Sequence, residues 1–424
     1  MTDALARRIE DRRDDLVALT QDLVRIPTRN PPGENYREIC AALEARLTPR
    51  GFAGAWIRAE GAPGDSAAYP RWNIVARREG ARPGPCVHFN GHTDVVTLGD
   101  GWTRDPFGGA VEGDRIYGRG TCDMKGGLAA AIVAAEAFID EHPGFAGAIE
   151  ISGTADEESG GYGGVAHLAR EGWFAPGRVD HVIIPEPLGK DRICLGHRGA
   201  WWAEIETLGE IAHGSMPFLG DCAVRHMGAV LAAFEAELFP ALAARRTEMP
   251  VIPDGARQAT MNLNALHGGE PARGPGDTSL PACNVPDRCT LQIDRRVLIE
   301  EGVDAAAAEI GALLERLKET RPGFDYRLRE INRVIPSMTP EDAPVVTTLR
   351  AAIADTLGAE AAFVASPGSY DQKHIDRIGA LRNCVAYGPG ILELAHKPDE
   401  WVGITDMRDS ARVMGRVLER LLLP

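Results

Sequence analysis

The sequence has no excess of basic residues: 46 lysines and arginines stand against 61 aspartates and glutamates, which gives a formal net charge of -15. This balance argues against nucleic acid and anionic membranes as partners. The chain also has no run of apolar residues long enough to span a membrane. Residues 1–26 space their apolar side chains among charges, which predicts an amphipathic helix and lacks the apolar centre of a signal peptide. We therefore expect a cytoplasmic protein.

The sequence also has no cysteine framework. Its eight cysteines are scattered, without a CxxC pair or a compact cluster. Such spacing is typical of reduced thiols in a cytosolic protein and excludes a disulfide-rich secreted domain. None of these cysteines is a candidate metal ligand.

The length and composition indicate an ordinary globular protein with more than one domain. Hydrophobic residues make up 44% of the 424 residues and charged residues make up 25%. One hydrophobic core rarely serves a chain of this length, so two domains or one domain with a large insertion are expected. The change in pattern described below places a first domain at 1–198 and 334–424, interrupted by an inserted domain at 199–333.

The first domain alternates buried strands with helices. Apolar runs at 87–90, 148–154 and 181–184 predict strands, and residues 128–139 form a helix that is apolar nearly all round. Repetition of strand and helix is typical of an α/β fold with a mainly parallel sheet and helices on both faces.

The inserted domain has a different order of elements. Strands are expected at 201–208, 259–266, 289–297 and 324–331, with helices at 223–239 and 303–317. The order βαββαβ is typical of a ferredoxin-like α+β domain with an antiparallel sheet and two helices on one side.

Imidazole and carboxylate side chains follow the predicted strands of the first domain. His92 and Asp94 end the strand at 87–90, Glu157 and Glu158 follow the next strand, and Glu186 follows the third. In a sheet covered by helices, ligands bind outside the carboxyl ends of the strands. A carboxylate two residues after a histidine is what a metal-ligating imidazole needs to fix its orientation, so Asp94 is expected to orient His92.

Two further loops complete a candidate metal site. Asp123 lies in a glycine-rich loop before the apolar helix, and His396 lies two residues before Pro398 near the end of the chain. Together with His92, Glu158 and Glu186 they supply two imidazoles and three carboxylates, which suits two divalent metals that share one carboxylate. Nitrogen and oxygen ligands without cysteine suit zinc, cobalt or manganese. Glu157 cannot easily bind the same ion as its neighbour, so it is free to act as a base.

The motifs GHTDVV, GRGTCDMKGG, ADEESGG, PEP and AHKPDE, in this order, resemble those of the M20 metallopeptidase and deacylase family, which includes acetylornithine deacetylase and succinyl-diaminopimelate desuccinylase. The resemblance implies that His92, Asp123 and Glu186 hold one metal and that Asp123, Glu158 and His396 hold the other. It implies that Glu157 takes a proton from the attacking water and passes it to the leaving nitrogen. A cis peptide after Asp123 is also common in the family.

The resemblance extends to the inserted domain, which would be a lid and dimerisation domain. His213 matches a lid histidine that serves the active site of the other subunit, so at least a homodimer is expected and a higher oligomer is possible. Asn262 matches a lid asparagine that contacts substrate, and Gly368 would line the pocket. The chain departs from the family where Tyr370 follows Ser369, and this tyrosine would narrow the pocket or stack on an aromatic substrate.

The predicted function is therefore the hydrolysis of a non-peptide amide bond in a small substrate that bears a carboxylate, as in an N-acyl amino acid deacylase. Two divalent metal ions per subunit are expected, with zinc favoured over cobalt and manganese. One alternative is an aminohydrolase that releases ammonia from an aromatic amino acid such as a nitroanthranilate. Another is a metalloprotein that binds small acids without turnover, which the presence of Glu157 disfavours.

Overall fold

The computed structural model of the protein describes residues 3–270, 280 and 283–423. Contacts divide the chain into two compact units, the first of Met1–Gly196, Met338–Val364 and Tyr370–Pro424 and the second of His197–Ser337 and Ala365–Ser369. The sequence did not assign residues 365–369 to the inserted segment. They belong to the second unit because Ala365 donates a backbone hydrogen bond to Pro250 at 2.8 Å and accepts one from Ile252 at 3.1 Å.

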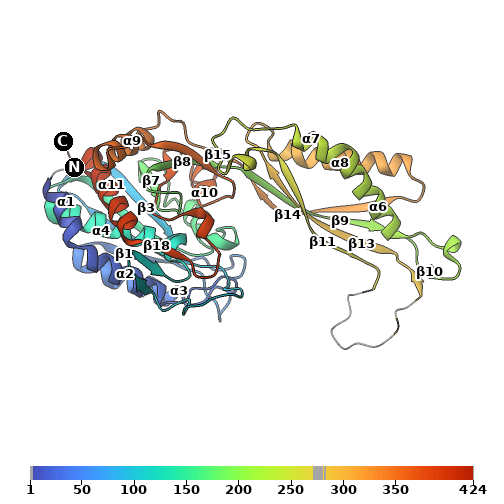
Figure 1. The fold of residues 1–424 in the computed structure, drawn as a ribbon, viewed down its shortest axis with the longest axis horizontal. Helices are drawn as coiled ribbons and strands as arrows, with labels where there is room; N and C mark the ends of the chain where they lie inside the picture. The colour runs from blue at the N-terminus through green and yellow to red at the C-terminus, as the bar shows by residue number, and fades with distance from the viewer. Residues whose placement is uncertain (1–2, 271–279, 281–282, 424) are drawn as a thin grey trace. The chain divides into compact units, whose positions relative to one another are not determined.

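A large mixed sheet forms the centre of the first unit (Figure 1). Its strands are β1 (Ala53–Arg58), β2 (Trp72–Glu79), β3 (Arg82–His92), β6 (Ala146–Thr154), β7 (His181–Ile184), β8 (Arg192–His197), β15 (Ser337–Met338), β16 (Ala362–Ser366) and β17 (Cys384–Ala386). The strand β3 pairs in parallel with β6 and β7, and β7 pairs in parallel with β17. The strands β1, β2 and β8 join in antiparallel fashion toward the edges. Because β3, β6 and β7 run in parallel, their carboxyl ends lie at the same edge of the sheet.

Helices cover both faces of this sheet. They are α1 (Asp3–Asp11), α2 (Arg13–Val24), α3 (Tyr36–Leu47), α4 (Gly126–Glu141), α5 (Val165–Arg170), α9 (Pro344–Leu357), α10 (Gln372–Arg377) and α11 (Ile404–Leu422), with short turns η1 (Thr48–Arg50), η2 (Thr121–Lys125), η3 (Glu157–Ser159) and η7 (Leu392–Leu394). The helices α4 and α11 pack against each other over one face (Figure 1), while α5 and α10 contact each other on the opposite one. Val87 and Phe89 of β3 belong to the core on the α4 side, so His88 and Asn90 face the other side.

The amphipathic helix predicted over residues 1–26 is broken in two. Arg12 stands between α1 and α2 with φ -96° and ψ 14°, outside helical geometry. Its guanidinium donates to Glu136 at 2.9 Å and also to Asp140, both on α4. Neither proline nor glycine marks the break in the sequence, because the cause is this long-range contact.

The start of α4 depends on glycine. A Cβ at Gly127 would overlap the carbonyl oxygen of Pro185, which follows β7. The glycine thus allows the helix to approach the end of that strand closely. The peptide bond between Asp123 and Met124, just before α4, is cis, as the family resemblance predicted. A small sheet of β4 (Ala110–Glu112), β5 (Arg115–Tyr117) and β18 (Trp401–Gly403) lies in the same unit.

The second unit is a four-stranded antiparallel sheet with helices packed on it. Its elements are β9 (Gly199–Leu208), β10 (Ala212–His213), η4 (Pro217–Leu219), α6 (Ala223–Ala233), η5 (Phe234–Leu238), α7 (Phe239–Ala243), η6 (Asp254–Arg257), β11 (Thr260–Gly268), β12 (Asn284–Val285), β13 (Arg288–Val297), α8 (Val303–Thr320) and β14 (Asp325–Val334). The sheet order is β11-β13-β9-β14. Ala203 and Ile205 of β9 pack in one core with Val230 of α6 and Leu314 of α8. The predicted fold class, with its ferredoxin-like insertion, is confirmed.

One helical run contradicts the expectation from the sequence that no segment could cross a membrane. Residues Ala223–Ala243 are long and apolar enough to do so by length and composition, with a mean hydropathy of 1.2. Their buried side chains, which include Met227, Val230 and Phe234, recur every three or four residues and pack on the sheet of the second unit. This periodicity is typical of the core helix of a globular domain.

Candidate metal centre

Five side chains predicted as metal ligands lie together in the first unit. His92 ends β3, Glu158 lies in the turn after β6, and Glu186 follows β7, so the parallel strands deliver all three to one edge of the sheet. Asp123 lies in η2 before α4, and His396 follows η7. Their donor atoms form two groups, His92 with Asp123 and Glu186, and Asp123 with Glu158 and His396. Asp123 is common to both groups.

The two oxygens of Asp123 face different groups. Oδ1 lies 3.1 Å from Nε2 of His92, and the same nitrogen lies 3.9 Å from Oε1 of Glu186. Oδ2 lies 3.5 Å from Nε2 of His396, which is also 3.1 Å from Oε2 of Glu158. A carboxylate with one oxygen turned to each group has the arrangement of a bridging ligand.

The donor set fits two divalent cations. Ligand atoms about 2.0–2.1 Å from a tetrahedral zinc ion lie about 3.3 Å from one another, and the separations around Asp123 bracket that value. The donors are imidazole nitrogens and carboxylate oxygens, which suit zinc, cobalt and manganese. His396 has a φ of +65°, a backbone conformation that a non-glycine residue rarely adopts and that clusters at functional sites.

The carboxylates repel one another in the absence of a cation. Burial, followed by the charge of Asp123, raises the pKa of Glu186 well above its ordinary value. Burial likewise raises the pKa of Glu158 to about 7, although the hydrogen bond from His396 opposes this. Hydrogen bonds to Asp123 and Glu158 raise the pKa of His396 to about 10. Buried acids that disfavour their own charge in this way are stabilised by a bound cation.

Asp94 has a contact that the sequence pattern did not predict. Its carboxylate accepts hydrogen bonds from the backbone N–H groups of Glu157 and Glu158, both at 3.1 Å, and from the side chain of Asn30 at 2.9 Å. Nδ1 of His92 donates to the main-chain oxygen of Asp94 at 3.0 Å, while the carboxylate lies 3.6 Å away. Asp94 therefore orients His92 mainly through its backbone, and its carboxylate fixes the turn that carries Glu157 and Glu158.

Glu400 holds the loop of Asp123 in a comparable way. This buried side chain accepts hydrogen bonds from the backbone N–H groups of Gly120, Cys122 and Asp123 at 2.9–3.1 Å. Arg119 donates to its other oxygen at 2.7 Å. The sequence did not predict this contact, although Glu400 ends the motif AHKPDE, which also contains His396.

Glu157 lies beside the metal-ligand cluster and contacts a lysine. Lys373 Nζ donates to Oε1 of Glu157 at 3.2 Å, and their side chains are 6% and 10% exposed. Burial opposes the charge on Lys373, but Glu157 and then Asp371 outweigh it and raise the pKa of the lysine. The sequence did not predict a role for Lys373 or Asp371, although both lie close to Tyr370, where the chain departs from the family.

Three predicted residues of the substrate site or lid lie in the second unit. His213 is exposed on β10, and its Nδ1 accepts a hydrogen bond from the backbone of Ser215 at 3.1 Å. Asn262 is exposed on β11, where its side chain donates to Asn264 at 2.6 Å. Gly368 is partly buried in the segment Ala365–Ser369. Their predicted roles remain proposals.

Tyr370, predicted to narrow the pocket or to stack on an aromatic substrate, has a buried side chain. It lies in the first unit and is 4% exposed. Its hydroxyl donates to Oε1 of Gln372 at 2.6 Å and lies 3.4 Å from the main-chain oxygen of Cys194. The predicted role of Tyr370 in substrate binding remains a proposal.

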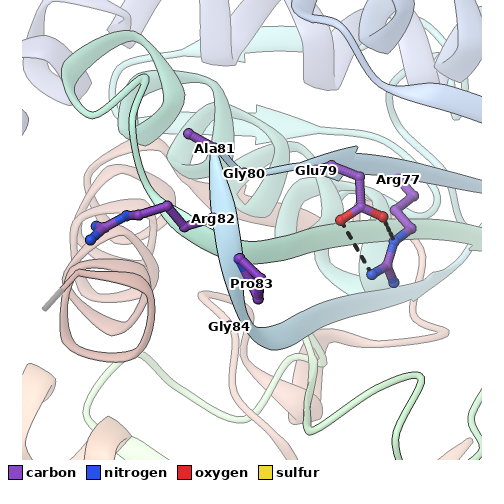
Figure 2. A pocket seen from close by; sticks show the side chains of 8 residues that line it. Arg77, Glu79, Gly80, Ala81, Arg82, Pro83 and Gly84 are labelled. Atoms are coloured by element: carbon purple, nitrogen blue, oxygen red, sulfur yellow. Dashed lines mark hydrogen bonds and ion pairs between the residues drawn. The ribbon is translucent and has the colours of Figure 1, made fainter.

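A polar hollow at the opposite end of β3 is not part of this site. Figure 2 shows it at the turn between β2 and β3, where Arg77 pairs with Glu79 and Arg82 points away from them. The turn precedes β3, whereas His92 ends that strand. With one acid and two arginines in its lining, the hollow lacks the donors that a divalent cation needs.

An α/β sheet that gathers imidazoles and carboxylates at the carboxyl ends of its parallel strands, with a further glutamate beside them, is the arrangement of a metal-dependent hydrolase. The sequence profile of the peptidase family M20/M25/M40 matches residues 88–420. The chain belongs to this family, which confirms the resemblance and the prediction of a hydrolase.

Relatives support the family assignment over the whole chain. A protein of Stenotrophomonas maltophilia named succinyl-diaminopimelate desuccinylase is 31% identical over 96% of this chain and 98% of its own. One of the same name from Methylobacterium radiotolerans is 29% identical over 96% of each chain. The solved structure of an M20 family metallo-carboxypeptidase from Sulfolobus solfataricus has a TM-score of 0.75 at 18% identity and covers 96% of this chain and 99% of that one. The structural likeness shows a shared fold.

Proposed function

We propose that the protein is a metal-dependent hydrolase of the amide bond in an N-acyl amino acid, and that an N-succinyl amino acid is its most suitable substrate class. The observation that carries the proposal is the pair of donor groups joined by Asp123, with Glu157 beside them. The names of the two relatives, which cover nearly the whole chain, favour the succinyl group.

The proposed roles of the site residues follow from their positions. His92, Asp123 and Glu186 would hold one ion, and Asp123, Glu158 and His396 the other. When bound, the two ions lower the pKa of a water molecule and stabilise charge on the amide oxygen. Glu157, which belongs to neither donor group, accepts the proton of the attacking water and delivers it to the leaving nitrogen.

Metal identity is part of the proposal. We propose zinc in both sites, with cobalt and manganese as ions that also support activity, because the donors are imidazoles and carboxylates without a thiolate. Elemental analysis of protein purified without chelators tests this directly. Two zinc ions per chain are expected, and a preparation that is fully active with one ion would overturn the dinuclear part.

We propose that the second unit acts as a lid and forms a homodimer through which His213 serves the site of the other copy. Three apolar side chains near His213 in the sequence are exposed, namely Ile211 at 59%, Phe218 at 79% and Leu219 at 60%. Exposed apolar side chains in one loop are typical of an interaction surface. Light scattering should give the mass of a dimer, and His213→Ala should lower kcat without changing that mass. A fully active monomer would contradict the role of His213.

A screen of substrates tests the reaction itself. Metal-loaded protein is incubated with N-succinyl, N-acetyl and N-formyl amino acids and with aromatic amino acids, and the release of carboxylic acid and of ammonia is measured separately. Hydrolysis of N-succinyl substrates with release of succinate is expected. Release of ammonia alone would favour the aminohydrolase alternative. A protein without turnover of any acyl amino acid would contradict the proposal.

We also propose a cytoplasmic location. All eight cysteines are free thiols, as expected in a reducing compartment. Fractionation of cells that express the full chain tests this expectation, and recovery of the protein with the membrane fraction would contradict it.

A further inference from the structure

We infer that Lys373 is a positioning residue for the proposed base, Glu157. The segment that carries Lys373 is itself fixed by a buried series of hydrogen bonds. The inference rests on the proposed function, since it concerns the side chain of Glu157. Nothing in the family motifs that identified the site assigns a role to Lys373.

The contact between Lys373 and Glu157 is enclosed. Nζ donates to Oε1 of Glu157 at 3.2 Å, with the two side chains almost fully buried. A hydrogen bond between opposite charges is stronger than a neutral one, and it is screened little when buried. Glu157 has a flexible side chain, and a base acts only within about 2.6–3.2 Å of the proton that it accepts. A fixed partner removes orientations in which the carboxylate cannot reach that proton.

The backbone that carries Lys373 is itself held in place. Asp371, two residues earlier, is buried at 1% exposure, and its Oδ2 accepts a hydrogen bond from the side chain of Asn90 at 3.0 Å. Asn90 lies on β3 two residues before His92. The same strand thus orients one proposed metal ligand directly and the lysine through Asp371.

The hydrogen bonds continue into the protein. The Ser152 hydroxyl on β6 donates to Oδ1 of Asn90 at 2.8 Å, and it lies 2.8 Å from Nε2 of His88, which donates to it. Each of these side chains is fully buried. We call His88, Asn90, Ser152 and Asp371 the buried polar chain. A displacement of Asp371 would break its hydrogen bond with Asn90 and leave a buried amide N–H unpaired, which costs free energy.

The far end of the buried polar chain is also fixed by charge. Nδ1 of His88 lies 3.1 Å from Oε2 of Glu150, whose other oxygen accepts from Arg77 at 3.0 Å and from Arg178 at 2.6 Å. The buried polar chain is therefore connected through Glu150 to Arg77 and Arg178 at one end, and it reaches the segment beside Glu157 at the other. Such a continuous arrangement is suited to hold a side chain in one position.

Steady-state kinetics of metal-loaded variants on an N-succinyl amino acid test the inference. Lys373→Met should lower kcat about 10- to 100-fold and leave KM within about 2-fold, and Lys373→Arg should recover most of the loss. In a Glu157→Gln background, Lys373→Met should lower kcat no further. Lys318→Met, which removes an exposed lysine paired with Asp325 at 2.8 Å in the second unit, is the matched control and should not change kcat.

The same variants give a readout that does not need activity. The thermal midpoints of parent, Lys373→Met, Glu157→Gln and the double variant should be non-additive, with the double variant no less stable than the less stable single one. Additive midpoints would overturn the contact. If Lys373→Met raises KM at unchanged kcat, the lysine binds the substrate carboxylate and the positioning role is wrong. If Lys373→Met does not fold, Lys373→Gln replaces it in both measurements.

Failure of the inference is distinct from failure of the proposed function. If the parent protein hydrolyses no acyl amino acid, the proposed function fails while the midpoints still test the contact. If the parent is active and Lys373→Met has the kcat and KM of the parent, only the positioning role is wrong.

Discussion

Two sets of buried carboxylates in the first unit have opposite electrostatic surroundings. Glu136 on α4 is 0% exposed and accepts hydrogen bonds from Arg46 at 2.7 Å and from Arg12 at 2.9 Å. Glu158 and Glu186, near the ends of β6 and β7, are paired with imidazoles and share Asp123 as a negatively charged neighbour. Two arginines neutralise the charge of Glu136, whereas the imidazoles near Glu158 and Glu186 do not supply enough positive charge to neutralise the carboxylates around Asp123.

This difference separates a structural cluster from a functional one. The structural cluster is Glu136 with its arginines, and the functional cluster is Asp123 with Glu158, Glu186 and their imidazoles. An arginine is always charged, so a carboxylate that it pairs is satisfied by the fold alone. An imidazole is charged only when protonated, and it serves equally well as a neutral metal ligand. The carboxylates around Asp123 are therefore those that need a cation from outside the chain. The buried Glu400, paired with Arg119 at 2.7 Å, belongs with Glu136.

The largest expected effect is the loss of activity when the unligated glutamate of the functional cluster is changed. Glu157→Gln should lower kcat by about 10²- to 10⁴-fold because it removes the group that moves the proton. Elemental analysis should find the same metal content as in the parent, since Glu157 belongs to neither donor group. A variant with unchanged kcat would leave Glu157 without a role in the reaction.

The next largest expected effect is a loss of thermal stability when metal is removed from the functional cluster. If each ion is present at 100 times its Kd, each of the two ions stabilises the folded protein by about 2.7 kcal/mol, so a chelator should lower the midpoint of thermal unfolding. The effect should be absent in Asp123→Asn, which lacks the shared charge. An unfolding midpoint of the parent that does not respond to chelator would show that the functional cluster holds no cation.

Glu136→Gln, in the structural cluster, should change stability without changing activity or metal content. It should lower the free energy of unfolding by about 2 kcal/mol, because it leaves two arginines without their buried countercharge. Metal content and kcat should stay at the parental values. Denaturant unfolding together with elemental analysis checks both. Loss of metal from Glu136→Gln would mean that the two clusters are not independent.

The most gradual expected effect concerns pH. Burial, followed by the charge of Glu157, raises the pKa of Asp371 to about 7, whereas an unfolded aspartate titrates near 3.8. As pH rises between these values the unfolded state loses its proton first, so stability falls by at most about 1.4 kcal/mol per pH unit. In metal-free protein, Asp371→Asn should reduce this loss of stability with rising pH. Asp14→Asn, at a side chain that is 94% exposed, should leave it unchanged, and equal slopes for the parent and Asp371→Asn would contradict the raised pKa.

The sequence predicted the parts of the molecule that depend on local pattern. The strand expected at 181–184 is β7 with those bounds, and the residues that follow β3, β6 and β7 lie together because parallel strands end at one edge. The break at Arg12 escaped prediction because its cause lies on α4, more than a hundred residues away. Long-range contacts of this kind leave no local signal.

The site was predictable to the same extent. Motifs identified the residue types that bind metal, but they did not reveal which atom makes a contact, so the backbone contact between Asp94 and His92 was missed. They also did not indicate burial, so they did not predict that the side chain of Tyr370 is almost fully buried. Lys373 escaped notice because its partner, Glu157, is distant in the sequence.

Metal titration by calorimetry, with elemental analysis of the product, tests the central account most directly. The parent chain should bind two divalent ions. Glu158→Gln should bind one because it loses a ligand of a single site, and Asp123→Asn should bind neither tightly because both sites share its carboxylate. A parent that binds no divalent ion, or a Glu158→Gln protein that still binds two, would contradict the shared site.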